Sequence, residues 1–252
     1  MGQTNSVGEM TQNIPSKAQD PMGSAIYDFH KKGKAGILRV FSSQFDEDEI
    51  PVADLFRDYA DMPQLEKVAL DAACGRILDV GAGSGCHSVA LQDMGKEVTA
   101  IDISPLSVEV MSERGIDARL IDLYDDGFTE RFDTVLMLMN GTGIIGTLEN
   151  MPVFFDRMRC LLNQGGKVLI DSSDLRYLYE EEDGSLMIDL ADDYYGLLDY
   201  QMQYEDVIGE PFDWLYVDFE TLAFHAENNG FKASLVAEGD HYDYLAELTI
   251  AR

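Results

Sequence analysis

The chain has 252 residues, 46% of them hydrophobic, so it can bury a core as one large domain or as one domain with a small cap. Its formal charge of −29 disfavours nucleic acid and anionic membrane surfaces as partners, because both attract clustered Lys and Arg. The three cysteines show neither disulfide nor metal-ligand spacing, and no stretch approaches the roughly 18 consecutive apolar residues of a membrane helix. We therefore expect a cytoplasmic protein without a metal site.

The N-terminal region is expected to be a tail followed by a cap. Residues 1–20 are polar and predict a disordered tail, since they lack the apolar core of a signal peptide. Residues 21–73 contain three short helix-like segments, at 23–32, 52–59 and 63–73. These segments are too short to build a core of their own. They predict an N-terminal helical cap that packs over the ligand-binding edge of the following domain, residues 74–252.

From residue 76 onward, strand and helix signals alternate regularly. The helices carry recognisable ends, such as Ser104 and Pro105 at one start and Gly115 at its end. This alternation predicts an α/β fold in which right-handed crossovers connect parallel strands. The expected strands are at 76–80, 97–101, 118–121, 134–139 and 165–171, and the expected helices are at 86–94, 105–115 and 150–162.

The pattern changes after the fifth strand. Residues 200–206 and 212–217 are rich in aromatic and β-branched side chains and predict a hairpin. A helix at 218–229 and two strands at 232–238 and 244–250 follow. The segment 172–196 is longer than an ordinary connection, so we expect a lid or a substrate-binding loop there.

The most informative motif is the glycine-rich turn after the first buried strand. Gly81, Gly83 and Gly85 alternate with small residues, so a ligand can approach the backbone and the N–H groups of the next helix. Asp102 ends the second strand and is placed to accept hydrogen bonds from both hydroxyls of a ribose. Together these residues predict a nucleoside site.

The turn departs from the dinucleotide pattern G-x-G-x-x-G, because Cys86 occupies the place of the last glycine. Asp79 would also repel a diphosphate, whereas it suits a cationic, hydroxyl-rich ligand. With these residues the chain resembles the class I S-adenosylmethionine-dependent methyltransferases, over roughly residues 65–252. The resemblance implies a Rossmann-like, doubly wound, mostly parallel seven-stranded sheet with antiparallel C-terminal strands.

The resemblance also implies which residues hold S-adenosylmethionine. The first motif contacts the methionine and ribose parts, the second strand tip contacts the ribose, and the third contacts the adenine. Arg57 is a further candidate, because the cofactor carboxylate needs a cation; the alternative for Arg57 is an ion pair with one of the many acids. The expected cofactor-binding residues are Asp79, Gly81, Ala82, Gly83, Gly85, Asp102, Ile103, Asp122, Leu123, Asn140 and Arg57.

Methyl transfer depends mainly on positioning. Holding two reactants together contributes about 7 kcal/mol or more, whereas a general base contributes about 3–5 kcal/mol, so an obvious base is not required. Weak catalytic candidates at the expected site are Asn140, His87, Asp171 and Asp174. His87 also suits a packing role at a helix start, and Asn140 suits a simple turn because Gly141 follows it. Most of the 12 tyrosines lie between Tyr177 and Tyr244, which suits either a cation-binding aromatic pocket or strand packing.

The expected function is methyl transfer to a small-molecule acceptor. The tip of the fourth strand reads Asn140-Gly-Thr-Gly143, not the Asn/Asp-Pro-Pro-Tyr of the enzymes that methylate adenine or glutamine. The acceptor atom remains open among N, O, C and S. Two alternatives also remain open: transfer of another group, such as aminopropyl, from a related nucleoside, and S-adenosylmethionine binding without turnover.

Overall fold

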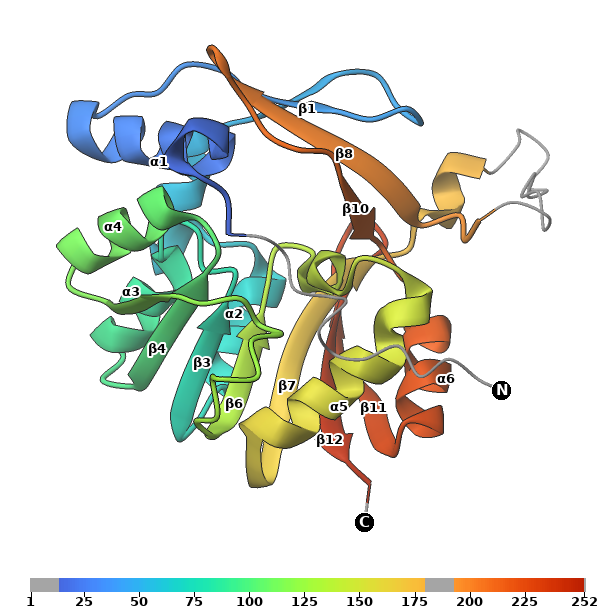
Figure 1. The fold of residues 1–252 in the computed structure, drawn as a ribbon. Helices are drawn as coiled ribbons and strands as arrows, with labels where there is room; N and C mark the ends of the chain where they lie inside the picture. The colour runs from blue at the N-terminus through green and yellow to red at the C-terminus, as the bar shows by residue number, and fades with distance from the viewer. Residues whose placement is uncertain (1–13, 180–192, 252) are drawn as a thin grey trace.

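The centre of the molecule is a seven-stranded sheet, whose strands follow the order β11-β12-β7-β6-β3-β4-β5 (Figure 1). The computed structural model describes residues 14–179 and 193–251. The strands of this sheet are β3 (Arg76–Val80), β4 (Glu97–Asp102), β5 (Asp117–Leu120), β6 (Phe132–Met137), β7 (Leu162–Ser173), β11 (Phe231–Glu238) and β12 (Asp243–Ile250).

The strand directions confirm the expected fold class. Strands β5, β4, β3, β6 and β7 pair in parallel, whereas β12 is antiparallel to both β7 and β11. Strand β11 therefore runs with the parallel set, and only β12 opposes it. The expected antiparallel C-terminal ending is thus a single reversed strand inserted between two strands of the common direction.

Helices cover both faces of this sheet. They are α2 (Gln64–Ala72), α3 (Cys86–Asp93), α4 (Pro105–Glu113), α5 (Met151–Leu161) and α6 (Phe219–Asn228). Successive residues of β3 point to opposite faces: Leu78 packs in the cluster that contains α5 and α6, and Ile77 packs in the cluster that contains α2 and α3.

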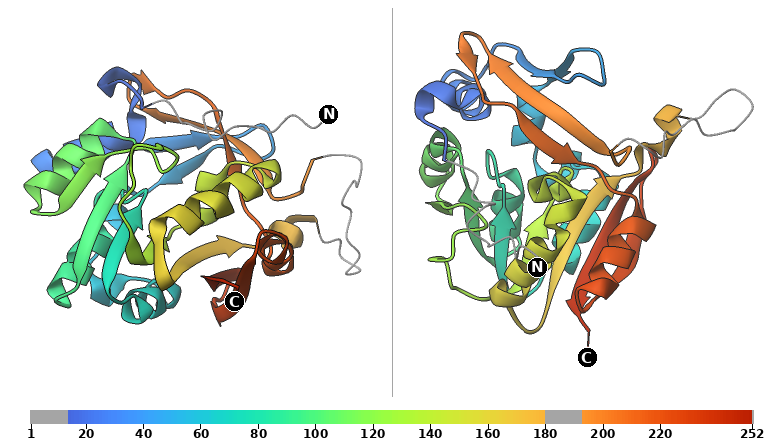
Figure 2. Two further views of the ribbon diagram at one scale, coloured as in Figure 1. Left: turned by 60° about the horizontal axis from the view of Figure 1, so that its bottom comes forward. Right: turned by 45° about the vertical axis from the view of Figure 1, so that its right-hand side comes forward.

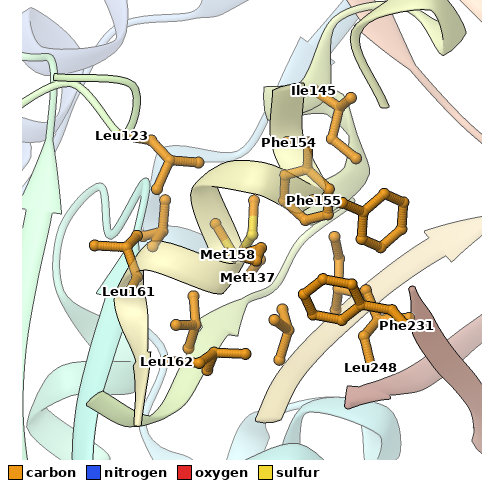
Figure 3. Packing of buried hydrophobic residues seen from close by; sticks show 14 of the residues in the cluster. Leu123, Met137, Ile145, Phe154, Phe155, Met158, Leu161, Leu162, Phe231 and Leu248 are labelled. Carbon is orange, nitrogen blue, oxygen red and sulfur yellow. The ribbon is translucent and has the colours of Figure 1, made fainter. Parts of the chain in front are cut away.

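The larger cluster lies between the sheet and α5 (Figure 3). Phe154, Phe155 and Met158 are fully buried there, and the ring of Phe155 lies 5.0 Å from that of Phe231. Fully burying one such side chain stabilises the fold by about 1.5–3 kcal/mol. This packing fixes the sheet, so the loops at the carboxyl ends of its strands extend from a rigid base.

A second, antiparallel sheet crosses above the carboxyl ends of the parallel strands (Figures 1 and 2). Its strands follow the order β10-β8-β1-β2, and β9 pairs with β8. They are β1 (Leu38–Phe41), β2 (Asp48–Ile50), β8 (Leu197–Tyr204), β9 (Val207–Ile208) and β10 (Phe212–Leu215). The first helix, α1 (Pro21–Lys32), packs beside this sheet and against α4.

The N-terminal cap is therefore not purely helical, which corrects the expectation from the sequence. Helices α1 and α2 form close to the expected positions, but the expected helix at 52–59 is replaced by the short 3₁₀ helix η3 (Val52–Phe56), and a second one, η4 (Tyr59–Asp61), begins at its last residue. Strands β1 and β2 were not expected at all. The expected hairpin does form, as β8 and β10, but it pairs with β1 and not with the seven-stranded sheet.

Two expectations fall largely outside the described residues. They concern the disordered tail at 1–20 and the lid or substrate loop at 172–196, of which 1–13 and 180–192 are not described. Within the described parts, the 3₁₀ helices η2 (Lys17–Gln19) and η7 (Leu175–Tyr179) form. Within residues 14–179 and 193–251, no helix combines the length and the apolar composition needed to cross a membrane. The remaining short helices are η5 (Gly141–Ile145) and η6 (Leu148–Asn150).

Candidate active site

The glycine-rich turn adopts the backbone that only glycine accepts easily. Gly81, Gly83 and Gly85 have φ values of 66°, 57° and 80°. Asp102 braces this turn, because its Oδ2 accepts the N–H of Gly83 at 2.8 Å and its Oδ1 accepts the N–H of Ser104 at 2.8 Å. An ionised carboxylate has further lone pairs, so Asp102 can brace the turn and still accept hydroxyl groups.

A cavity of about 1460 Å³ lies between this turn and the second sheet. Most of the residues that were predicted to bind the cofactor line it. They are Asp79, Gly81, Ala82, Gly83, Asp102, Ile103, Asp122, Leu123 and Asn140. The structure thus brings together strand tips that are far apart in the sequence.

The glycines of the turn have different roles. A Cβ built on Gly83 would contact only Ile26, at 3.8 Å, so this backbone faces open space in the cavity. A Cβ on Gly85 would instead lie 2.3 Å from Ile116 and 2.9 Å from Met111. Gly85 does not line the cavity. Because it has no side chain, α3 can begin close to α4 and to the start of β5.

The third strand tip supplies Asp122 and Leu123. Both are buried, and Oδ1 of Asp122 accepts the N–H of Tyr124 at 2.8 Å. Both residues line the cavity, where they offer an apolar side chain and a carboxylate. Their contact with the adenine and its amino group stays a prediction.

The fourth strand tip is a strained turn. Met139 and Asn140 have φ values of 66° and 60°, a conformation that costs about 1–3 kcal/mol for residues other than glycine. Asp171 stabilises it by accepting the N–H groups of Met139 at 3.0 Å and Gly141 at 2.9 Å. Burial raises the pKa of Asp171 to about 6. This residue does not line the cavity, so its geometry supports a shaping role and not the expected catalytic one.

Asn140 lines the cavity, but its amide is already bound. Its Nδ2 donates to the carbonyl of Leu215 at 3.2 Å, and its Oδ1 accepts from the Ser172 hydroxyl at 3.0 Å. Asn140 thereby ties the strand tip to the second sheet. Asp174 lies outside the cavity lining, where it pairs with Arg176 at 2.6 Å and accepts from the Tyr195 hydroxyl at 2.8 Å.

Beneath the turn, Asp79 is buried and lines the cavity. Its Oδ2 accepts the Ser88 hydroxyl at 2.6 Å, and burial raises its pKa. Its position matches the expected binding of the positively charged part of the cofactor, since an opposite charge would restore the anion that burial disfavours.

His87, Glu66 and Arg57 form a buried chain beside Asp79. The Nε2 of His87 lies 2.9 Å from Glu66 Oε2, and Arg57 Nε donates to the same oxygen at 3.1 Å. His87 lines the cavity, whereas Arg57 does not. The structure therefore shows the ion-pair alternative for Arg57, with the pair buried and not at the surface. A role of Arg57 in binding the cofactor carboxylate stays a prediction.

The second sheet contributes residues that the sequence analysis did not place among the cofactor-binding residues. Strands β1 and β2 were not expected, whereas the tyrosines on this side are among those for which an aromatic pocket and strand packing both remained open. The cavity residues on this side include Val40, Asp48, Tyr200, Met202, Phe212, Trp214 and Tyr216.

Comparison with known proteins agrees with this geometry. Residues 77–166 match the family described as a methyltransferase domain. An uncharacterised methyltransferase of Staphylococcus carnosus is 28% identical over 152 residues, which are 56% of this chain and 72% of that protein. The CcbJ methyltransferase of Streptomyces caelestis, 17% identical with a TM-score of 0.60 over 93% of this chain and 99% of that one, shares the fold.

The strongest evidence is a crystal structure of an S-adenosylmethionine-dependent methyltransferase from Bacteroides fragilis in complex with S-adenosyl-L-homocysteine. It is 62% identical to this chain, with a TM-score of 0.91, and the match covers 97% of this chain and 100% of that one. The chain therefore belongs to the S-adenosylmethionine-dependent methyltransferases, and its cofactor is S-adenosylmethionine.

Proposed function

We propose that this methyltransferase acts on a small-molecule acceptor held between the glycine-rich turn and the second sheet. The observation that carries the proposal is the cavity of about 1460 Å³, which is lined by both parts of the molecule. Pockets for one small ligand usually measure about 300–1,000 Å³. The cavity thus has room for the cofactor and for an acceptor beside it.

The cavity residues fit the cofactor chemically. Gly83 leaves open space next to the backbone, and the carboxylates of Asp79, Asp102 and Asp122 suit an ammonium group, ribose hydroxyls and an adenine amino group. Among the described residues that line the cavity, none is Lys or Arg, the side chains that make the strongest contacts with a diphosphate. When bound, S-adenosylmethionine supplies a methyl group on a positively charged sulfur.

The residues of this chain act mainly by positioning. The strand tips hold one reactant and the second sheet covers the other, which excludes water and supplies most of the rate enhancement. Glu66 fixes one ring nitrogen of His87. We propose that the other nitrogen, Nδ1, is available to accept a proton from an acceptor bound in the cavity.

The charge of −29 favours a metabolite over a nucleic acid as the acceptor. A cytoplasmic location, where S-adenosylmethionine is made and used, remains part of this proposal.

The experiment uses S-adenosylmethionine with an isotopically labelled methyl group and an extract of the source cells. After incubation, low-molecular-mass, protein and nucleic acid fractions are analysed by mass spectrometry. We expect label in a low-molecular-mass product, with heat-inactivated enzyme as the control. Label confined to protein or nucleic acid would contradict the proposed acceptor class, and cofactor binding without label in any fraction would favour a protein that binds without turnover.

A further inference from the structure

The acceptor side of the cavity has an unusual charge balance. Among the described residues that line the cavity, the only ionisable side chains besides His87, a cysteine and the tyrosines are carboxylates. Several carboxylates are already engaged: Asp102 braces the turn, and Glu47 pairs with Arg39 at 3.1 Å. Asp48 lies on the acceptor side, on β2. An anionic acceptor would find no cation here to neutralise it.

The register of the second sheet shows which side chains share the cavity face. Val40 pairs with both Asp48 and Met202, and Tyr200 pairs with Phe212. All five line the cavity. Because side chains alternate along a strand, Trp214 lies on the same face as Phe212. We name Tyr200, Phe212, Trp214 and Tyr216 the aromatic wall.

The rings of the aromatic wall contact one another. The ring centres of Tyr200 and Phe212 are 6.1 Å apart, and those of Phe212 and Trp214 are 5.8 Å apart, both with edge-to-face geometry. The hydroxyls of Tyr200 and Tyr216 are 3.3 Å apart. Burial raises the pKa of both tyrosines. Asp48 is exposed, and it shares the cavity face of the sheet with this pair through its pairing with Val40.

The wall is held against the fourth strand tip. A Cβ on Gly143 would lie 2.1 Å from Cε2 of Trp214, so the indole packs directly on the backbone of η5. The carbonyl of the next residue, Leu215, accepts hydrogen bonds from Asn140 and Thr142. These contacts place aromatic rings beside the fourth strand tip, on the side of the cavity where we propose that the acceptor binds.

We propose that the acceptor is an amine, bound as its cation by the aromatic wall and Asp48. Aromatic faces attract cations, and a carboxylate beside them adds a charge partner. This inference rests on the proposed function. For transfer, the ammonium first loses one proton to Nδ1 of His87, the base proposed above, and its nitrogen lone pair then forms the new bond to the methyl carbon. The bond from that carbon to sulfur breaks with its electrons left on sulfur, and the product is the N-methylammonium ion.

The binding test uses the single tryptophan of the chain, Trp214, as a fluorescence reporter. Protein saturated with S-adenosylhomocysteine is titrated with benzylamine, benzyl alcohol and benzoate, which share a ring but differ in charge. We expect benzylamine to half-saturate the signal at a concentration at least tenfold lower than benzyl alcohol, and benzoate to give no saturable change. Equal binding of the three probes, or preferred binding of benzoate, would overturn the inference.

Two variants of β2 test whether the cation binds at Asp48. Asp48→Asn should remove most of the preference for benzylamine over benzyl alcohol. Glu49→Gln is the matched control, because Glu49 is the next residue of β2, lies outside the cavity and is exposed. If Asp48→Asn keeps the full preference, the proposed cation site is wrong.

Fractionation of the labelled products separates this inference from the proposed function. If labelled small molecules pass through a sulfonate cation-exchange resin at neutral pH, small-molecule methylation stands and the amine inference fails. If no small molecule is labelled although benzylamine is still preferred, the proposed function fails and the cation site stands. Labelled products retained on the resin support both.

Discussion

The carboxylate of Asp20 accepts a hydrogen bond from the hydroxyl of Ser104 at 2.6 Å, and this contact joins the first turns of α1 and α4. Asp20 also accepts the N–H of Gly23 at 2.8 Å, while Ser104 accepts the N–H of Ser107 at 2.9 Å. Gly23 lies so close to the Asp20 carboxylate that a Cβ on Gly23 would be 2.2 Å from Asp20 Oδ2. Two helix caps thus attach the N-terminal segment to the edge of the main sheet.

Replacing Asp20 with Ala should destabilise the protein. Loss of the α1 cap costs about 1 kcal/mol, and loss of the acceptor for Ser104 adds a comparable amount, so we expect about 2 kcal/mol in total. Urea unfolding measures this change. Asp93→Ala is the control, since Asp93 is exposed at the end of α3 and should give a change near zero. Equal stability of the two variants would show that the Asp20–Ser104 contact contributes nothing.

Cofactor affinity should depend on pH through Asp102. Burial raises the pKa of Asp102 to about 6, although hydrogen bonds from Ser104 and Gly83 lower it in part. Above this pH the carboxylate is ionised and accepts hydroxyl groups; below it, a proton occupies one oxygen. Affinity for S-adenosylhomocysteine should therefore fall about tenfold per unit as the pH drops below 6. Calorimetry at several pH values tests this. In Asp102→Asn, the affinity for S-adenosylhomocysteine should stay low and should not change with pH.

Asp102→Ala should weaken cofactor binding more than Asp122→Ala. Asp102 is placed to accept two charge-assisted hydrogen bonds, worth about 1.5–3 kcal/mol each, and it also braces Gly83. Asp122 is expected to accept one bond from an amino group. Calorimetry of both variants at pH 8, which is above the pKa of Asp102, gives the comparison. Equal or reversed losses would mean that the strand tips have been assigned wrongly.

The sequence predicts those parts of the structure whose signals lie within a short stretch of the chain. Strand β3 was predicted at its observed bounds, Arg76–Val80, because a strand buried on both faces is a continuous apolar run between turn residues. The glycine-rich turn and Asp102 were found together because the turn needs glycine and the carboxyl ends of neighbouring parallel strands share one edge. The fold and the cofactor half of the cavity follow from these two rules.

The acceptor half was predicted only in part: its hairpin was expected, but the pairing of that hairpin with β1 depends on contacts that are not local. Strand β1 has four residues, and its Leu38 pairs with Tyr204. A strand of this length gives no reliable alternation, so no strand was predicted between the expected helical segments at 23–32 and 52–59. The partner of Arg57 was equally hidden, because Glu66 is one of 47 acidic residues and nothing in the sequence singles it out.

Gly143→Ala should impair the acceptor side and spare the cofactor side. A Cβ at 2.1 Å from the indole of Trp214 forces the ring away, so the tryptophan fluorescence should shift and the turnover should fall at least tenfold. Affinity for S-adenosylhomocysteine should change less than twofold. In the control Gly36→Ala, the added methyl lies 3.4 Å from its nearest neighbours and should alter neither property. Unchanged turnover in Gly143→Ala would show that the position of Trp214 is unimportant.

Glu66→Gln should destabilise the protein strongly near neutral pH. Burial raises the pKa of Glu66, but hydrogen bonds from His87 and Arg57 outweigh it, so its pKa is lowered. Replacing the anion leaves the buried guanidinium of Arg57 without its partner, which costs about 3–5 kcal/mol. A carboxylate with a lowered pKa contributes stability above its unfolded value of about 4.3, and loses it as the pH falls through the folded value. The difference in free energy of unfolding between the wild type and Glu66→Gln should be largest near pH 7 and should shrink below about pH 4.

Urea unfolding of the wild type and Glu66→Gln at these pH values measures the stability, and Arg57→Met separates the two roles considered for Arg57. If Arg57 serves only as the partner of Glu66, Arg57→Met should lose stability while the folded protein keeps its affinity for S-adenosylhomocysteine within about threefold. The reverse result, near-normal stability with a loss of affinity of tenfold or more, would show that Arg57 leaves Glu66 to bind the cofactor carboxylate. In that case the buried ion pair is exchanged for a charged ligand contact when the cofactor binds.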